Sequence, residues 1–286
     1  MLLPEARRAV AAARFVASAH DLPVDEAVVL RNSNRLAVRL LPCDVLARVA
    51  PSAEQNAAFE VELAQRLADA DSPVAALEPR VEPGVYERDG FAITLWTYYE
   101  ELSHREVSPP DYANALARLH AGMRSLQLAT PHFTDRLAEA EALVANPDRT
   151  PTLAVEDREI LKDALRSTLR AIVDRRAAEQ VLHGEPHPGN LLNTESGLRF
   201  IDLETCCRGP VEFDLAHVPA KVVEHCPNID QVLINDCRGL VLAMVAAWRW
   251  DPGDQLPNGR HAAQRLVSAL REGPPWPTLD EVMAEV

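Results

Sequence analysis

Two short stretches of the sequence bring together residue types that can do chemistry. The first reads His183-Gly-Glu-Pro-His-Pro-Gly-Asn190, and Arg199-Phe-Ile-Asp-Leu-Glu204 follows shortly after it. They supply a carboxylate, a histidine, a side-chain amide and a second pair of carboxylates. Transfer of a phosphoryl group from a nucleotide needs such a set, because one group receives or orients the acceptor hydroxyl while oxygen atoms bind magnesium. The two stretches therefore predict a phosphoryl-transfer site.

The first stretch is predicted to be a loop. Pro186, Pro188 and Gly189 disfavour a regular helix across it. His183 and His187 therefore do not form the histidine pair of a zinc protease, because that pair lies one turn apart on a real helix.

The second stretch is predicted to complete a hairpin. Strand-like residues flank a turn at residues 193–197, and the returning strand would bring Asp202 close to Asn190. Two oxygen donors placed in this way suit magnesium, which proteins hold with few ligands of their own together with nucleotide phosphates. Because strand side chains alternate, Glu204 is expected on the same face as Asp202, where it would serve a second metal ion or the acceptor.

The elements that must position these residues change in type along the chain. In the front part, strands are expected over residues 27–30, 35–40, 44–49, 84–86 and 91–97, with helices over 1–20 and 53–70. In the back part, helices are expected over residues 110–126, 133–145, 154–178, 229–249 and 259–271, with a β region at 191–203 as the only break. This order predicts an α+β fold with two lobes, divided into a domain at residues 1–97 and a domain at residues 98–286.

Composition restricts the class of partner. The chain of 286 residues is 47% hydrophobic and 25% charged, which is ordinary for a globular protein. Its formal net charge of −14 argues against a nucleic-acid partner, which would require a basic surface. The same acidity fits a cleft that attracts a cationic small molecule, and it fits equally well a protein that its charge keeps soluble.

Cysteine usage and hydropathy indicate the compartment. The five cysteines are an odd number without metal-site spacing, which predicts reduced thiols. The longest apolar run, around residues 239–248, is shorter than a membrane span needs, and Arg7, Arg8 and Arg14 interrupt any signal-peptide core. We therefore expect a cytoplasmic location, with no membrane partner and no obligate protein partner.

The central block of the sequence resembles the aminoglycoside phosphotransferase family, which is related to protein kinases and to choline, homoserine and fructosamine kinases. The core of that family reads His-Gly-Asp-x-His-x-x-Asn, then Ile-Asp-x-Glu or Ile-Asp-x-Asp, then Asp-Leu-Ala. The matching stretches here are His183-Gly-Glu-Pro-His-Pro-Gly-Asn190, Ile201-Asp-Leu-Glu204 and Asp214-Leu-Ala216. Weaker similarity includes Glu60-Val-Glu-Leu-Ala-Gln-Arg-Leu67 and Leu116-Ala-Arg-Leu-His120, so that the resemblance spans roughly residues 30–250. It implies a protein-kinase-like fold with a nucleotide-binding first lobe and a catalytic, acceptor-binding second lobe.

The resemblance also implies roles for the residues of the central block. Glu185 would orient or deprotonate the acceptor hydroxyl. Asn190 and Asp202 would bind Mg²⁺ on the phosphates of ATP or GTP. Three further residues would serve the loop or the transferred phosphate: His183 as a brace, Asp214 as an anchor of the loop backbone, and His187 facing the phosphate.

In the first lobe, the resemblance places Arg48 at the strand position that usually carries the nucleotide-binding lysine, with Glu60 as its salt-bridge partner. The hinge that receives the adenine would present backbone groups of residues such as Leu95 and Thr97. Two alternatives stay open: Arg48 as an ordinary edge-strand residue, and Glu62 in place of Glu60.

Two features depart from the family pattern. Glu185 stands where the family has Asp, and its extra methylene changes how far the carboxylate reaches. A catalytic group that is misplaced by about 1 Å can lower the rate on the order of 100-fold. The turn Arg31-Asn-Ser-Asn-Arg35 contains no glycine, so a phosphate cradle there would depend on Asn and Ser.

Other polar residues carry weaker signals. His120, His217 and His225 are expected to be structural. The acidic residues Asp135, Glu139 and Glu141 could line an acceptor pocket, but their pattern is equally that of a solvated helical face.

These features lead to one main hypothesis and its rivals. The main hypothesis is a Mg²⁺-dependent phosphotransferase that moves the γ-phosphate of ATP or GTP to a hydroxyl of a small cationic acceptor, such as an aminoglycoside, with antibiotic resistance as its role. One rival is a kinase of a metabolic alcohol or sugar, of the choline, homoserine or fructosamine kinase type. Another is a nucleotide-binding pseudokinase with a regulatory role, although the presence of Asn190, Asp202 and Arg48 speaks against it.

Overall fold

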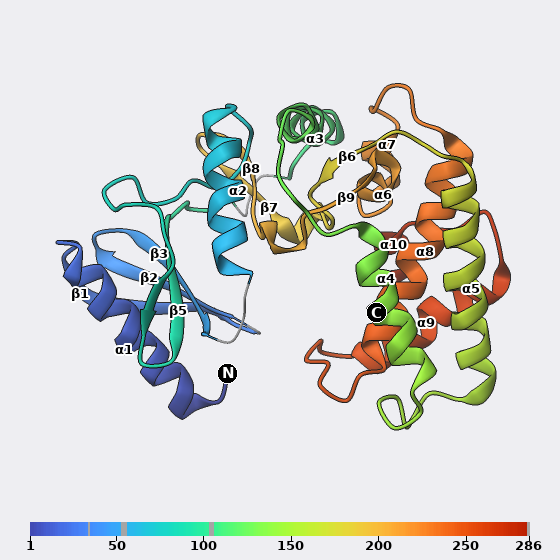
Figure 1. Cartoon of the computed structure of the whole chain (residues 1–286), viewed down its shortest axis with the longest axis horizontal. Coiled ribbons are helices and arrows are strands. Elements are labelled where there is room, and N and C mark those ends of the chain that lie inside the picture. The colour runs from blue at the N-terminus through green and yellow to red at the C-terminus, as the bar shows by residue number, and fades with distance from the viewer. Residues whose placement is uncertain (34, 53–55, 103–105, 285–286) are drawn as a thin grey trace. The chain divides into compact units, whose positions relative to one another are not determined.

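The structure is a computed structural model that describes every residue of the chain except 34, 53–55, 103–105 and 285–286. The described chain divides into two compact units, one formed by Met1–Glu106 with Leu191–Glu204 and the other by Val107–Asn190 with Thr205–Val286. An antiparallel sheet forms the centre of the first unit, whereas the second consists mainly of helices (Figure 1). The α+β fold class predicted from the sequence is confirmed.

The first unit contains a five-stranded antiparallel sheet in the order β1-β2-β3-β5-β4. Its strands are β1 (Val24–Asn32), β2 (Leu36–Pro42), β3 (Val45–Pro51), β4 (Tyr86–Arg88) and β5 (Phe91–Thr97). Between β2 and β3 the chain reverses at Asp44, whose φ of 58° lies in the left-handed region that Asp tolerates. The predicted meander of the first three strands is confirmed.

Alternation along β3 sorts its side chains between the two faces of the sheet. Val45, Ala47 and Val49 are buried in a core that they share with helix α1 (Leu3–Ala19), which lies along the sheet in Figure 1. Arg48 therefore points to the opposite face. Helix α2 (Ala57–Asp69) supplies a buried carboxylate, Glu60, which meets Arg48 there.

A hairpin late in the chain also belongs to the first unit. Its strands are β7 (Leu191–Thr194) and β8 (Gly197–Phe200), with Leu191 opposite Phe200 and Thr194 opposite Gly197. The backbone of Phe200 fixes the hairpin to this unit. The N–H of Phe200 donates to the carbonyl of Pro73 at 2.8 Å, and the carbonyl of Phe200 accepts from the N–H of Ala75 at 2.9 Å. The hairpin predicted after Asn190 is confirmed.

The second strand of this hairpin ends earlier than predicted. It stops at Phe200, and Asp202 has a φ of 66°, which breaks the strand conformation. Glu204 lies in a short 3₁₀ turn, Leu203–Thr205. The inference that strand alternation puts Asp202 and Glu204 on one face is therefore wrong, because neither residue lies in a strand.

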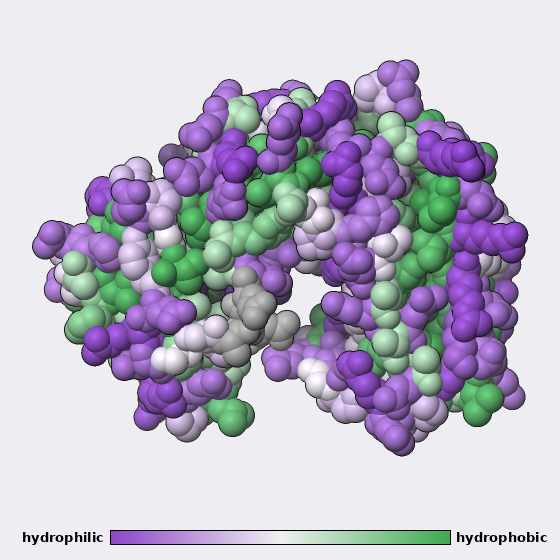
Figure 2. Space-filling model, in the orientation of Figure 1, coloured by the Kyte–Doolittle hydropathy of each residue, from purple (hydrophilic) through white to green (hydrophobic). Residues whose placement is uncertain are grey.

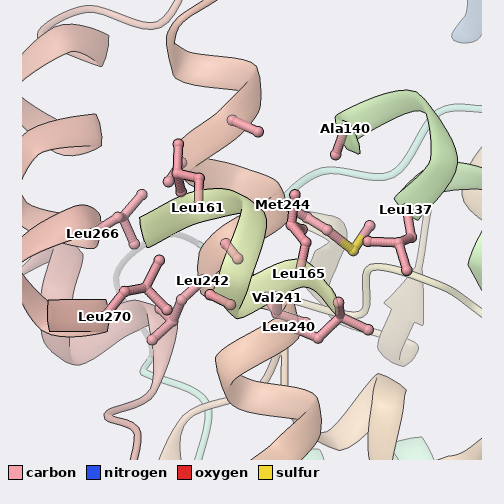
Figure 3. Packing of buried hydrophobic residues seen from close by; sticks show 14 of the residues in the cluster. Leu137, Ala140, Leu161, Leu165, Leu240, Val241, Leu242, Met244, Leu266 and Leu270 are labelled. Atoms are coloured by element: carbon pink, nitrogen blue, oxygen red, sulfur yellow. The ribbon is translucent and has the colours of Figure 1, made fainter. Parts of the chain in front are cut away.

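The helices described in the second unit are α3 (Pro109–Arg124), α4 (Phe133–Ala145), α5 (Val155–Asp174), α6 (Val211–Leu215), α7 (Ala220–Val223), α8 (Gln231–Arg249), α9 (Gly259–Glu272) and α10 (Leu279–Met283). All of them except α3 and α7 contribute residues to one apolar core. Figure 3 shows leucines of α5, α8 and α9 turned toward one another, while the Met244 side chain reaches toward Leu137 of α4. Hydrophilic residues cover most of the face of this unit that Figure 2 shows.

Helix α8 is the centre of this core. Within the described residues it is the one helix that is long and apolar enough to cross a membrane by length and composition, and most of it is buried inside the protein. Its apolar residues contact the other helices of the core, so its hydropathy is accounted for by packing.

A two-stranded sheet in the second unit was not predicted. Strands β6 (Glu179–Leu182) and β9 (Cys207–Pro210) pair antiparallel, with Leu182 opposite Cys207. The prediction that residues 191–203 are the only β region of the back part is therefore wrong. Strands of four residues show too little periodicity to be distinguished from the neighbouring helix, yet β6 leads directly into the loop that begins at His183.

Candidate active site

One buried carboxylate anchors the loop that follows β6. Oδ1 of Asp214, in α6, accepts a hydrogen bond from the backbone N–H of Gly184 at 2.8 Å, and Oδ2 accepts one from that of His183 at 3.0 Å. Nε2 of His120 lies 2.8 Å from Oδ2. Burial alone would raise the pKa of Asp214. The hydrogen bond and the charge of His120, together with the backbone donors, have the larger combined effect, so the pKa of Asp214 lies below its ordinary value. An ionised Asp214 therefore fixes the loop backbone.

His120 has a more specific position than the sequence suggested. It lies near the end of α3, is 6% exposed, and contacts Asp214 rather than only filling the edge of the core. A single histidine on an amphipathic helix carries no such signal. The available signal was the segment Leu116–His120, which the family resemblance covers.

Further contacts hold the loop on both sides of Glu185. The backbone N–H of Glu185 donates to Nδ1 of His183 at 3.3 Å. The Tyr112 hydroxyl donates to the carbonyl of Pro186, and Nδ2 of Asn190 donates to the carbonyl of Glu185 at 3.0 Å. Asn190 ends the 3₁₀ turn Pro188–Asn190 and is itself buried. The backbone of Glu185 is thus fixed by both neighbouring turns.

The side chain of Glu185 is 22% exposed, and its carboxylate pairs with an arginine of α4. Nη2 of Arg136 donates to Oε1, and the guanidinium carbon of Arg136 lies 4.8 Å from the centre of the Trp248 ring. Burial raises the pKa of Glu185, but the charge and hydrogen bond of Arg136 outweigh burial and leave the pKa below its ordinary value. Glu185 is therefore ionised at neutral pH. Neither Arg136 nor Trp248 had been singled out from the sequence.

His217 lies beside this pair, in the turn after α6. It is 6% exposed, and its Nε2 is buried with no hydrogen-bond partner in the described part of the chain. Burial lowers the pKa of His217 to about 4, with smaller effects from Glu185 and Asp214, which raise it, and from Arg136 and His187, which lower it. The imidazole is therefore neutral at neutral pH.

This burial predicts a pH-dependent contribution of His217 to stability. In the unfolded chain its pKa returns to the ordinary 6.5, so below that pH the unfolded state binds a proton that the folded state excludes. We expect the unfolding free energy of the wild type, relative to His217→Gln, to be highest above pH 6.5 and to fall by about 3 kcal/mol as the pH decreases toward 4. Urea unfolding of both proteins across this range measures the difference, and a difference that does not change with pH would contradict it.

In the first unit, Arg48 joins two carboxylates. Nη1 donates to Oε1 of Glu60, and Nη2 donates to Oδ1 of Asp202 at 2.6 Å. Burial lowers the pKa of Arg48, but the two carboxylates raise it by more. Glu60 is 1% exposed, whereas Glu62 pairs with Arg66 on the outer surface of α2. The structure therefore gives Arg48 the partner Glu60 and not Glu62.

Arg35 extends this cluster and was not singled out from the sequence. Its Nη1 donates to Oε2 of Glu60 at 2.7 Å, and its Nη2 pairs with Glu204. Burial and the neighbouring Asp202 raise the pKa of Glu204 to about 7, although Arg35 lowers it. An arginine at the end of a turn is usually solvated, so only the tertiary structure reveals its partners.

The predicted hinge residues lie at the end of β5. The carbonyl of Leu95 accepts from the backbone N–H of Glu78 at 3.0 Å, and the N–H of Thr97 donates to the carbonyl of Ala76 at 3.0 Å. These two backbone groups are therefore engaged within the first unit. An adenine that bound here would have to use other backbone groups of this segment.

The structure places two more of the predicted residues, His187 and Asp135. Nδ1 of His187 accepts from the backbone N–H of Gly189 at 3.0 Å. Asp135 accepts from the backbone N–H of His132 at 2.9 Å and completes the capping box of α4, which accounts for its position. The glycine-free turn between β1 and β2 includes residue 34, which lies outside the described residues.

Each predicted magnesium ligand offers an oxygen atom. Only Nδ2 of Asn190 can donate to the Glu185 carbonyl, so Oδ1 of Asn190 stays available as a ligand. Oδ1 of Asp202 accepts from Arg48, and no hydrogen bond within the described chain engages its Oδ2. No group of three or more His, Cys, Asp or Glu that could hold a metal occurs among the described residues. Each of these side chains therefore carries an oxygen of the kind that magnesium takes when phosphate oxygens complete its shell.

Comparison with known proteins identifies relatives of this chain. The family model described as the phosphotransferase enzyme family (APH) matches residues 26–225. No curated protein sequence matches the chain.

Solved kinase structures share its fold. An amicoumacin kinase in complex with AMP-PNP and Ca²⁺ superposes with a TM-score of 0.70 and 12% identity over 98% of this chain and 100% of that chain. A choline kinase from Streptococcus pneumoniae has a TM-score of 0.66 and 15% identity, with 91% of this chain and 98% of that chain covered. The GDP complex of an aminoglycoside 2'-phosphotransferase has a TM-score of 0.66 and 14% identity, with 95% and 96% covered.

Identities this low establish the fold alone, which is the two-lobed fold of protein-kinase-like enzymes. The family match extends over more than half of the chain, from residue 26 to residue 225. The resemblance seen in the sequence is confirmed. The chain belongs to the APH phosphotransferase enzyme family and is a small-molecule phosphotransferase.

Proposed function

We propose that this phosphotransferase moves the γ-phosphate of ATP or GTP to a hydroxyl group of a small molecule, with Mg²⁺ as its metal. The observation that carries the proposal is Glu185, a partly exposed and ionised carboxylate on a loop whose backbone Asp214 anchors. A fixed carboxylate of this kind suits phosphoryl transfer, which depends on positioning and electrostatics more than on a strong base.

Three side chains are proposed to bind the nucleotide and its metal ion. Arg48, already held by Glu60, is proposed to contact the α- and β-phosphates, where its planar fork suits phosphate oxygens. Asn190 and Asp202 are proposed to hold Mg²⁺, which neutralises charge on the phosphates when it is bound. Glu204 is a candidate for a second metal or the acceptor.

In the proposed step, the acceptor hydroxyl oxygen forms a bond to the γ-phosphorus while the bond from that phosphorus to the bridging oxygen breaks. ADP or GDP is the leaving group, and the hydroxyl proton passes to Oε2 of Glu185 and then to solvent. Because the pKa of Glu185 is low, its main contribution is to orient the hydroxyl. His187 is proposed to face the transferred phosphate, and Leu95 and Thr97 to lie near the adenine.

For the acceptor, we propose a cationic compound of the aminoglycoside type, which would make antibiotic resistance the biological role. The formal net charge of −14 supports this choice, because an acidic protein attracts cations. The structural neighbours include kinases of amicoumacin, choline and aminoglycosides, so a metabolic alcohol is the second candidate. The five cysteines form no disulfide among the described residues, which supports a cytoplasmic location for the reaction.

The test is release of ADP or GDP from Mg-ATP or Mg-GTP in the presence of aminoglycosides, choline, homoserine or sugars. We expect at least one class to stimulate turnover in the wild type. Nucleotide binding without stimulation by any acceptor would favour the regulatory pseudokinase, and no binding of either nucleotide would contradict the proposed function.

A further inference from the structure

The Glu185 carboxylate is held by a side chain from outside its loop. The anchoring contacts of the loop engage backbone atoms of Glu185: its N–H donates to His183, and its carbonyl accepts from Asn190. Among the described residues, the carboxylate itself forms a hydrogen bond with Arg136 alone. A glutamate has one more rotatable bond than an aspartate, so fixing its backbone leaves its carboxylate free to move. The contact with Arg136 removes that freedom.

Arg136 is itself fixed in place. It lies in the first turn of α4, which begins with the capping box formed by His132 and Asp135. The neighbouring Phe133 is 1% exposed and packs against Phe213 with ring centres 5.2 Å apart. The Arg136 guanidinium lies over Trp248 of α8, 4.8 Å from the ring centre, and only 20% of its side chain is exposed. A planar guanidinium held in this way presents its donors in one direction.

Stability does not explain this arrangement. Among the described residues, Nη1 of Arg136 is buried without a hydrogen-bond partner, and so is Nε2 of the nearby His217. Unpaired buried polar atoms lower stability, and apolar residues in place of a buried ion pair are often equally stable or more stable. The pair does fix Oε1 of Glu185, while no hydrogen bond within the described chain engages Oε2.

We propose that Arg136 is a positioning residue for phosphoryl transfer, which holds Oε1 of Glu185 so that Oε2 meets the acceptor hydroxyl. Arg136 in this way allows a glutamate to serve where the family motif has an aspartate. The inference rests on the proposed function, since it assigns Arg136 a part in that reaction. Trp248 supports it by fixing the plane of the guanidinium.

Turnover of Arg136 variants tests this role. We expect Arg136→Met to lower kcat by about 100-fold, the effect of a misplacement of about 1 Å, with the nucleotide Kd changed less than about twofold. Arg136→Lys keeps the charge but lacks the planar fork, so it should recover only part of the loss. Arg170→Met, at a surface arginine that is 85% exposed, is the control and should leave kcat unchanged.

The background variant Glu185→Asp separates positioning from general support of the fold. An aspartate at position 185 is too short to keep the same contact with Arg136. The kcat of the double variant Arg136→Met, Glu185→Asp should therefore be less than about threefold below that of Glu185→Asp alone. A loss of about 100-fold in both backgrounds, or no loss in the wild-type background, would overturn the positioning role.

A second measurement does not depend on activity. In a double-mutant cycle of urea unfolding, Arg136→Met and Glu185→Gln should each lower the folding equilibrium constant. If the two residues are paired, the folding equilibrium constant of the double variant should be at least about tenfold higher than the value obtained by multiplying the two separate effects. Independent effects would overturn the pairing whatever the activity. If the two substitutions have coupled effects on stability but the wild type turns over no acceptor, the contact between Arg136 and Glu185 exists and the proposed function is wrong.

Discussion

Glu185→Gln is expected to lower kcat by about 100- to 10,000-fold, the range lost when a positioned acid–base group is removed. The amide has nearly the same shape, but it carries no charge and cannot take up the proton of the acceptor hydroxyl. Affinity for the nucleotide should change less than about twofold, because the proposed phosphate contacts belong to Arg48 and the metal ligands. Steady-state turnover and equilibrium nucleotide binding measure the two quantities separately.

The control for this substitution is Glu156→Gln, at an exposed position in the first turn of α5. It makes the same chemical change on the surface of the protein and should leave kcat unchanged. Equal turnover of Glu185→Gln and the wild type would remove Glu185 from the reaction. A loss of nucleotide affinity that accounts for the whole defect would place its role in binding.

Gly184→Ala is expected to lower the unfolding free energy by about 3–5 kcal/mol, one of the largest effects of a single methyl group in this chain. Gly184 has a φ of 89°, and a Cβ atom there would lie 2.0 Å from the carbonyl oxygen of Thr205. Its N–H donates to Asp214 at 2.8 Å, and the Thr205 hydroxyl donates to the carbonyl of His183 at 3.0 Å. The loop backbone therefore cannot move aside without losing these bonds.

Gly197→Ala separates the clash from the backbone strain. Gly197 also has a positive φ, of 103°, but a Cβ atom there would meet nothing within 4 Å. This control should therefore lose only the cost of the left-handed conformation, about 1–2 kcal/mol. Thermal or urea unfolding compares the two variants, and equal losses would show that the contact with Thr205 does not matter.

The parts of the site that are continuous in sequence could be predicted. The loop from His183 to Asn190 contains two prolines and two glycines, and the hairpin after it alternates strand and turn residues, so local conformational preferences define both. The meander of β1 to β3 was predictable for the same reason. The prediction that the return strand continues through Asp202 was wrong, because a single left-handed residue ends a strand without any change in hydrophobic pattern.

The partners of these residues could not be predicted, because they come from distant segments. Arg136 lies 49 residues before Glu185, and on a solvated helix an arginine at that position would look the same. Arg35 and His217 acquire their surroundings only when strands and helices pack. Burial changes His217 from an ordinary histidine to one whose pKa is about 4, and burial is a tertiary property.

Transfer of a radiolabelled γ-phosphate from ATP or GTP to a small hydroxyl compound is the most direct test of the role proposed for Glu185. We predict that the wild type places the label on the acceptor in a Mg²⁺-dependent reaction and that Glu185→Gln does so at least about 100-fold more slowly. Label that appears only as inorganic phosphate, or equal transfer by the variant, would contradict the assignment of Glu185 as the residue that receives the acceptor hydroxyl.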